Sequence, residues 1–131
     1  MFIAILGRQP EISIAELEAV YGAKNVQKIS NQAATVNCDN LSIDNLGGTI
    51  KCGQVITKIK SQKSDCNTLL QASKIIVEKY TKKLSHSQKK ITLGISFYGN
   101  KTDPRSVQKI GIILKNNLKK SGVSLRLIPN K

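Results

Sequence analysis

The apolar residues of the first 60 positions fall into short runs separated by turn-forming residues, and this pattern constrains the fold more than any other feature. Residues 2–6 are an almost wholly apolar run, which predicts a buried strand. Apolar residues then recur at helical spacing over 14–21, and Ser13, three positions before Glu16, has the spacing of a capping box. The chain is therefore expected to open with a strand and a helix, and Gly22 is a suitable helix stop.

The following segments predict two short strands at 26–29 and 33–38, a short helix over 41–46 and a strand over 54–60. Strand, helix, strand, strand, helix, strand is the order of the ferredoxin-like unit, βαββαβ. We therefore predict an α+β protein in which residues 1–60 form an N-terminal ferredoxin-like domain.

Residues 61–131 are predicted to form a second, α/β domain, joined to the first through a polar linker at 61–64. Asp103 followed by Pro104 is a strong helix start, because an aspartate can cap the first turn and proline suits its first position. In chain order we expect a helix that Asp65 can cap and whose apolar face runs from Leu69 to Leu84, a strand over 91–97, a helix over 104–121 and a strand over 123–128.

The charge of the chain is unevenly distributed. Of 21 basic and 8 acidic residues, residues 1–60 hold six and five, whereas residues 61–131 hold fifteen and three, a net charge of +12. A near-neutral half joined to a strongly basic half predicts a polyanionic partner that the second half engages. The alternative is a lysine-rich, solvated surface without a partner.

The helix after Pro104 is predicted to be amphipathic. At about 100° per residue, its apolar residues between Val107 and Leu118 share one face, and four basic residues occupy the opposite face. Such spacing suits phosphate groups, although exposed helix faces are commonly lysine-rich for solubility alone. The net charge of +12 on residues 61–131 favours phosphate binding over a role in solubility alone. The four residues on the opposite face are Arg105, Lys109, Lys119 and Lys120, with Lys115 on the flank and Lys101 and Arg126 as extensions of the same surface.

Base-specific recognition and catalysis are not predicted. The chain has no Trp, and its two Phe and three Tyr residues are too scattered for a base-stacking platform, so recognition by shape and backbone is expected. We find no nucleotide fingerprint, no paired carboxylates and no triad partner for His86. Gly47 and Gly48 are interpreted as a helix stop and turn rather than as a phosphate-binding loop, because the P-loop spacing is lacking.

The three cysteines, Cys38, Cys52 and Cys66, are spaced fourteen positions apart without a close pair. Together with His86 they could in principle bind zinc, but structural zinc sites normally use close pairs of cysteines. We therefore interpret the three cysteines as reduced and buried, and we predict no metal. No stretch approaches the roughly 18–20 apolar residues of a membrane helix, and the start lacks signal-peptide features. We therefore expect no membrane partner and a cytoplasmic location.

Four segments of the chain carry a family resemblance. FIAILGRQPEISIAELEAVYG, residues 2–22, resembles the opening of bacterial members of a family of RNA methylases related to tRNA guanosine N2-methyltransferases. LGGTIK, residues 46–51, fits the later part of the same leader domain. ITLGISFYGN, residues 91–100, and LKKSGVSLRLIPNK, residues 118–131, resemble the THUMP domain that follows it. The resemblance covers nearly the whole chain.

The resemblance implies that residues 1–60 are a ferredoxin-like leader and that residues 61–131 are a THUMP-like RNA-binding domain, truncated at its C-terminus. In such enzymes the two domains grip the acceptor end of tRNA, while a C-terminal Rossmann-type domain binds S-adenosylmethionine and methylates a guanosine. The glycine-rich and Asp/Asn-Pro-Pro-Tyr motifs of that domain are absent here. We therefore expect a fragment that is not catalytic by itself, holds no cofactor and presents tRNA to a methyltransferase domain in cis.

Two further expectations follow from the resemblance. A truncated THUMP sheet would leave an unpaired strand edge, which predicts a homo-oligomer formed through that edge. The alternative to the methyltransferase reading is a stand-alone basic ferredoxin-like adaptor for ribosomal RNA or a protein partner. The basic residues carried over as RNA-binding candidates are Lys101, Arg105, Lys109, Lys115, Lys119, Lys120, Arg126 and Lys131.

Overall fold

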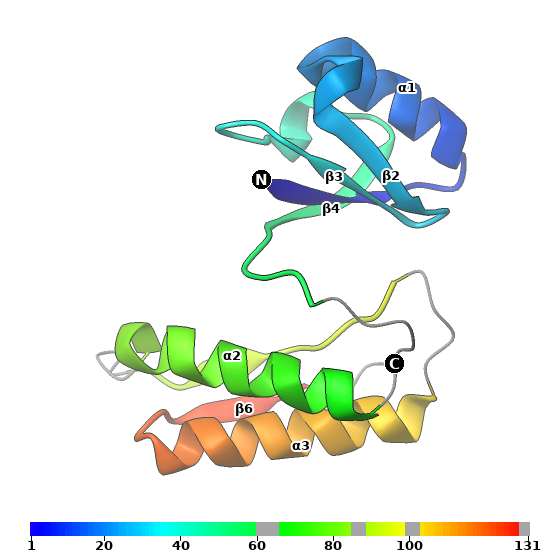
Figure 1. Cartoon of the computed structure of the whole chain (residues 1–131). Helices are drawn as coiled ribbons and strands as arrows, with labels where there is room; N and C mark the ends of the chain where they lie inside the picture. Colours follow the sequence, from blue (N-terminus) through cyan, green and yellow to red (C-terminus); the bar gives the residue numbers. More distant parts are fainter. Residues whose placement is uncertain (60–65, 85–88, 99–102, 129–131) are drawn as a thin grey trace. The chain divides into compact units, whose positions relative to one another are not determined.

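The computed structural model describes residues 1–59, 66–84, 89–98 and 103–128, and the chain divides into two compact units, Met1–Lys58 and Ile59–Lys131 (Figure 1). The described residues combine α-helices with a four-stranded antiparallel sheet and a separate two-stranded sheet, so the predicted α+β class is confirmed. Within these residues, no helix is long and apolar enough to cross a membrane. The predicted linker at 61–64 lies outside the described residues.

The first unit is a four-stranded sheet with one helix, α1, packed against it. Along the sheet the strand order is β2-β3-β1-β4, and every neighbouring pair is antiparallel. Because side chains alternate across a strand, Ala4 and Leu6 face Leu17 of α1, which is fully buried. The elements are β1 (Phe2–Leu6), α1 (Pro10–Tyr21), the 3-10 turn η1 (Ala23–Asn25), β2 (Val26–Ser30), β3 (Ala33–Val36), the 3-10 turn η2 (Ile43–Asn45) and β4 (Thr49–Gln54).

Two predicted elements of this unit were wrong. The helix over 41–46 is only the single turn η2, because so short a segment gains too few hydrogen bonds to offset helix nucleation. The strand over 54–60 is instead β4, at Thr49–Gln54, because β1 provides its partner only from Leu6 back to Phe2. Beyond Gln54, the Val55 amide donates to the Met1 carbonyl oxygen, and the pairing stops there.

The capping box predicted from Ser13 and Glu16 was also wrong. Helix α1 begins three positions earlier, at Pro10, because proline suits the first turn of a helix. Ser13 is therefore inside the helix, where it is buried. Its hydroxyl lies within donating distance of the carbonyl oxygens of Gln9 and Gly48 and does not accept from an amide of the first turn. The stop at Gly22 is confirmed, since this residue adopts a φ of +89° after the last helical residue.

The second unit is a helix followed by a β-α-β crossover. Strands β5 and β6 pair in parallel, with Ile91 opposite Leu125 and Leu93 opposite Leu127. Helices α2 and α3 lie side by side and run in the same direction (Figure 1). Their core contains Leu114, Leu118, Val123 and Leu125. The elements are α2 (Cys66–Leu84), β5 (Ile91–Leu93), α3 (Pro104–Lys120) and β6 (Leu125–Leu127).

The start of α3 is as predicted. Asp103 is the N-cap residue, and its carboxylate accepts a hydrogen bond of 3.2 Å from the Ser106 amide, with Pro104 in the first turn. The two strands are shorter than the predicted 91–97 and 123–128, because only three residue pairs of the parallel ladder form.

Candidate nucleic-acid interface

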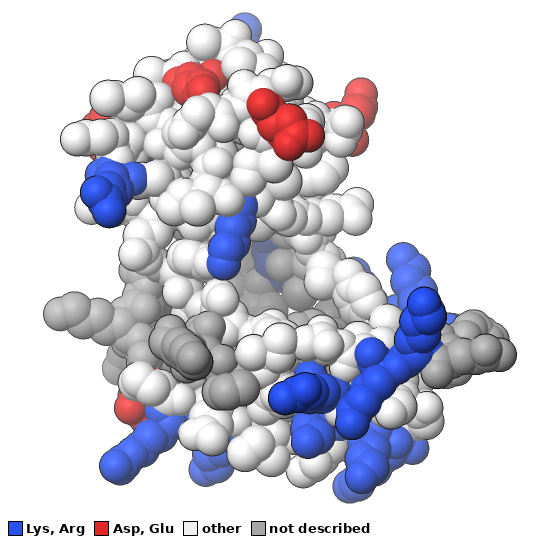
Figure 2. Space-filling view, turned by 180° about the vertical axis from the view of Figure 1, so that it is seen from behind, with Lys and Arg blue, Asp and Glu red and all other residues white. Residues whose placement is uncertain are grey.

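Basic residues are concentrated in the second unit. Met1–Lys58 contains five basic and five acidic residues, whereas Ile59–Lys131 contains sixteen and three, a net charge of +13. Figure 2 shows the blue Lys and Arg side chains gathered over the second unit, in the lower part of the view, and most of the visible Asp and Glu side chains on the first. The candidate interface is therefore sought on the second unit.

Helix α3 separates its apolar and basic residues as the sequence predicts. Ile110, Gly111, Leu114 and Leu118 are buried. A Cβ atom added at Gly111 would lie 3.1 Å from Leu127 Cδ2, so the helix sits close against β6 on this side. The residues Arg105, Lys109, Lys119 and Lys120 are exposed, and Lys115 is half-buried.

Arg126 lies on a different surface from the basic face of α3. It stands between Leu125 and Leu127 in β6, and it is exposed whereas Leu125 is buried. Because neighbouring side chains of a strand point to opposite faces, Arg126 points away from the face that α3 covers. It therefore does not extend the α3 surface, contrary to expectation. The two remaining candidates, Lys101 and Lys131, lie outside the described residues.

The fold places Lys119 and Lys120 at the same end of the second unit as four lysines that the sequence analysis did not select. The chain contains three Lys-Lys doublets, at 82–83, 89–90 and 119–120. The first ends α2, the second precedes β5, and the third ends α3. We call these six lysines the lysine end: Lys82, Lys83, Lys89, Lys90, Lys119 and Lys120.

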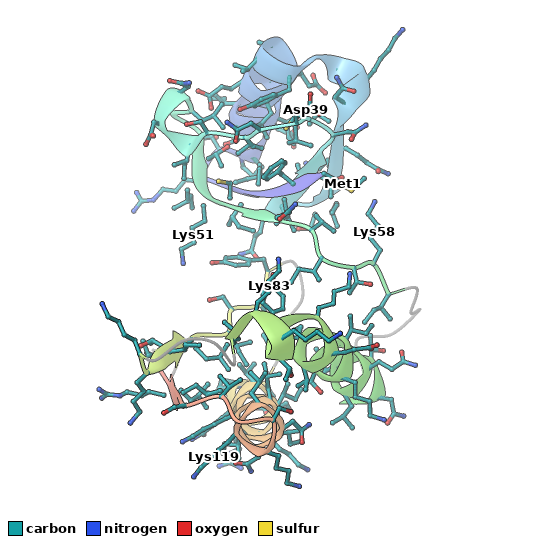
Figure 3. All side chains as sticks on the ribbon, turned by 90° about the vertical axis from the view of Figure 1, so that its left-hand side faces the viewer. Met1, Asp39, Lys51, Lys58, Lys83 and Lys119 are labelled. Carbon is teal, nitrogen blue, oxygen red and sulfur yellow. The ribbon has the colours of Figure 1, made fainter. Side chains whose placement is uncertain are left out.

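Contacts around the lysine end place its three segments at the same end of the unit. The amide of Ile91 donates to the Ser124 carbonyl oxygen at 2.9 Å, so β5 and β6 begin side by side. Leu84, which follows the first doublet, packs on the cluster that holds Leu118 and Val123. Figure 3 looks at this end, with Lys83 on α2 and Lys119 on α3 both labelled. In Figure 2 blue side chains crowd the same end of the unit, on the right-hand side.

All six side chains of the lysine end are exposed. Lys83 Nζ lies 6.0 Å from the centroid of the Tyr80 ring, over its face. Lysines in the last turn of a helix also interact favourably with the negative end of the helix dipole, by about 0.3–1 kcal/mol each. That role applies to the doublets that end α2 and α3, whereas Lys89 and Lys90 precede a strand.

The described part of the chain contains no candidate metal site. No group of three His, Cys, Asp or Glu side chains there is placed to hold a metal ion. Cys38 is a half-buried thiol whose pKa is raised, chiefly by burial. Cys52 is exposed, so the expected burial was wrong for this residue. The side chains of Cys66 and His86 lie outside the description.

The glycine turn before β4 is occupied by protein groups. The amides of Gly47 and Gly48 each donate a hydrogen bond of 2.7 Å to the Glu16 carboxylate. A phosphate would have to displace this carboxylate, so the turn is a structural connection, in line with the sequence interpretation.

Comparisons with protein-family models, with curated proteins and with solved structures found no match for the chain. The candidate interface therefore rests on the geometry and charge of the second unit.

Proposed function

We propose that the chain binds RNA and that its second unit, Ile59–Lys131, makes the contacts with phosphate groups. The observation that carries this proposal is the segregation of charge: the first unit has no net charge, and the second has a net charge of +13. If lysines served only to keep the protein in solution, both units would benefit from them. Concentrated positive charge is the common signature of surfaces that neutralise nucleic-acid backbones.

Aromatic residues support binding through the backbone rather than through bases. The described aromatic residues of the second unit are Tyr80, Phe97 and Tyr98; the first two are half-buried, and Tyr98 is 37% exposed. A base-stacking platform needs several exposed rings on one surface. Recognition by shape and phosphate position is the mode that the available side chains allow.

We further propose that the chain serves a larger enzyme, an S-adenosylmethionine-dependent RNA methyltransferase acting on tRNA guanosine. The support is the sequence resemblance, together with the β2-β3-β1-β4 antiparallel sheet and α1, which are compatible with a ferredoxin-like leader. In this proposal the second unit is THUMP-like and holds the acceptor end of tRNA. A catalytic domain in cis would then supply the cofactor site and the chemistry.

The test is the binding of fluorescently labelled tRNA to the whole chain, followed by fluorescence anisotropy at several salt concentrations. We expect saturable binding whose log K falls linearly with log salt, by about 0.9 for each duplex phosphate contacted. Absence of saturable binding at low salt, or an affinity that does not change with salt, would overturn the proposal.

A further inference from the structure

The charges of the lysine end come from three separate segments, so they are spread over an area rather than aligned in a single row. Parallel helices packed side by side have axes roughly 8–10 Å apart, so the backbones that carry the lysines ending α2 and α3 are about one helix width apart. Consecutive residues of a helix diverge by about 100°, which spreads the two charges of the doublets that end α2 and α3. Lys89 and Lys90 add a third segment at the start of β5.

A surface of this kind suits a ligand that presents phosphates on two lines. Double-helical RNA does so at its major groove, which is deep and narrow, so that the phosphates of both strands approach each other at its mouth. A single strand presents one line of phosphates and is normally held with stacked bases. The aromatic ring that the structure places beside the lysine end, Tyr80, has Lys83 over its face.

We infer that the lysine end is the main RNA contact of the chain and that it binds phosphates of both strands across the major groove of an A-form duplex. This inference rests on the proposed RNA binding and adds the contact surface and the class of RNA. The basic face of α3 then contributes mainly through its C-terminal end, Lys119 and Lys120, and less through Arg105 and Lys109.

The experiment compares three double variants with a matched control in the whole chain. K82Q/K83Q, K89Q/K90Q and K119Q/K120Q each remove two charges from the lysine end. The control, K24Q/K51Q, removes two exposed lysines from the first unit, which carries no net charge. The probes are an RNA duplex of about 16 base pairs, the DNA duplex of the same sequence and the single RNA strand.

We expect each lysine-end variant to bind the RNA duplex roughly tenfold more weakly and to flatten the salt dependence by about two contacts, whereas the control changes affinity less than about twofold. The wild-type chain should prefer RNA duplex to DNA duplex, because the two carry the same charge but differ in groove geometry. Replacing a doublet by two arginines should retain binding, which separates lost charge from lost structure.

The outcomes separate this inference from the proposed function. If the wild-type chain binds RNA and the lysine-end variants behave like the control, the inference is overturned and the proposed function stands. Equal affinity for DNA duplex, or tighter binding of the single strand, would overturn the major-groove geometry. If the chain binds vesicles containing phosphatidylserine and no RNA, both proposals are wrong.

Discussion

Ser13 Oγ donates a hydrogen bond of 2.7 Å to the carbonyl oxygen of Gly48, which lies 35 positions later in the chain. Glu16, about one helical turn after Ser13, accepts the amide hydrogens of Gly47 and Gly48. Helix α1 is thus fastened at two points to the turn that leads into β4. These bonds satisfy backbone polar groups of the turn, which is exposed at Gly47 and half-buried at Gly48.

Replacing Gly48 by alanine should destabilise the first unit. The added Cβ would lie 2.8 Å from both Ser13 Cα and Ser13 Oγ, and 3.0 Å from Glu16 Oε2, so the turn must move and its hydrogen bonds must lengthen. We expect a loss of about 1–3 kcal/mol in the free energy of unfolding, measured by urea denaturation. Gly53→Ala is the control, since its Cβ would meet only Ile3 Cγ2, at 3.8 Å. Equal losses in both variants would contradict this account of the turn.

Removing the cap of α3 should weaken the second unit. Asp103→Ala deletes the carboxylate that accepts from the Ser106 amide at 3.2 Å and from Ser106 Oγ at 3.3 Å. We expect a loss of about 1 kcal/mol in stability, seen as a lower urea midpoint, while Asp103→Asn should retain most of it because asparagine also caps helices well. An alanine variant as stable as the wild type would show that the cap contributes nothing.

The two described thiols should react differently with alkylating reagents. Burial raises the pKa of Cys38, so less of it is thiolate at neutral pH, and the side chain is half-buried. Cys52 is exposed. We expect Cys52 to be alkylated first at pH 7 and the Cys38 rate to rise steeply as the pH increases, read by mass spectrometry of proteolytic peptides. Faster labelling of Cys38 at pH 7 would contradict the structure.

Local sequence signals predicted α3 well and β4 poorly, for a physical reason. The start of α3 depends on Asp103 and Pro104, which are adjacent, and its buried face follows from helical spacing within the segment itself. The position of β4 depends on where β1 can pair with it, and β1 lies nearly fifty positions earlier. The segment after Gln54 has the alternation of a strand, but it has no strand opposite in the described sheet.

The lysine end also depends on tertiary contacts that local sequence signals do not reveal. Each doublet is visible in the sequence, but their separation gives no reason to group them. The segments that carry them lie at the same end of the unit because β5 and β6 are parallel, which puts the end of α3 beside the start of β5, and because Leu84 packs with Leu118 and Val123. Tertiary contacts of this kind have no counterpart in helical spacing, so a helical wheel of α3 alone selected Lys119 and Lys120 and omitted the other four.

Self-association through a strand edge remains a prediction that can be tested by sedimentation. In the described residues, β5 and β6 pair only with each other, and unpaired backbone groups at a strand edge invite another strand. Because the second unit carries a net charge of +13, repulsion opposes association, and salt should relieve it. We therefore expect the apparent mass at high protein concentration to rise with salt. A monomer at every concentration and salt would argue against the edge contact.

Charge reversal on α3 should weaken RNA binding without weakening the fold. Lys109 and Lys119 are exposed, on the side of α3 opposite its buried residues, so K109E/K119E should change stability by only about 0.5 kcal/mol for each substitution. If these side chains neutralise phosphates, affinity should fall for all RNA sequences alike, and the salt dependence should flatten by up to about two contacts, with Lys119 contributing the larger share. K24E/K51E in the first unit is the control; Lys28 is unsuitable because it pairs with Glu11. Equal losses in both variants would place the contact elsewhere, and no loss in either would mean that the positive charge is solvated surface.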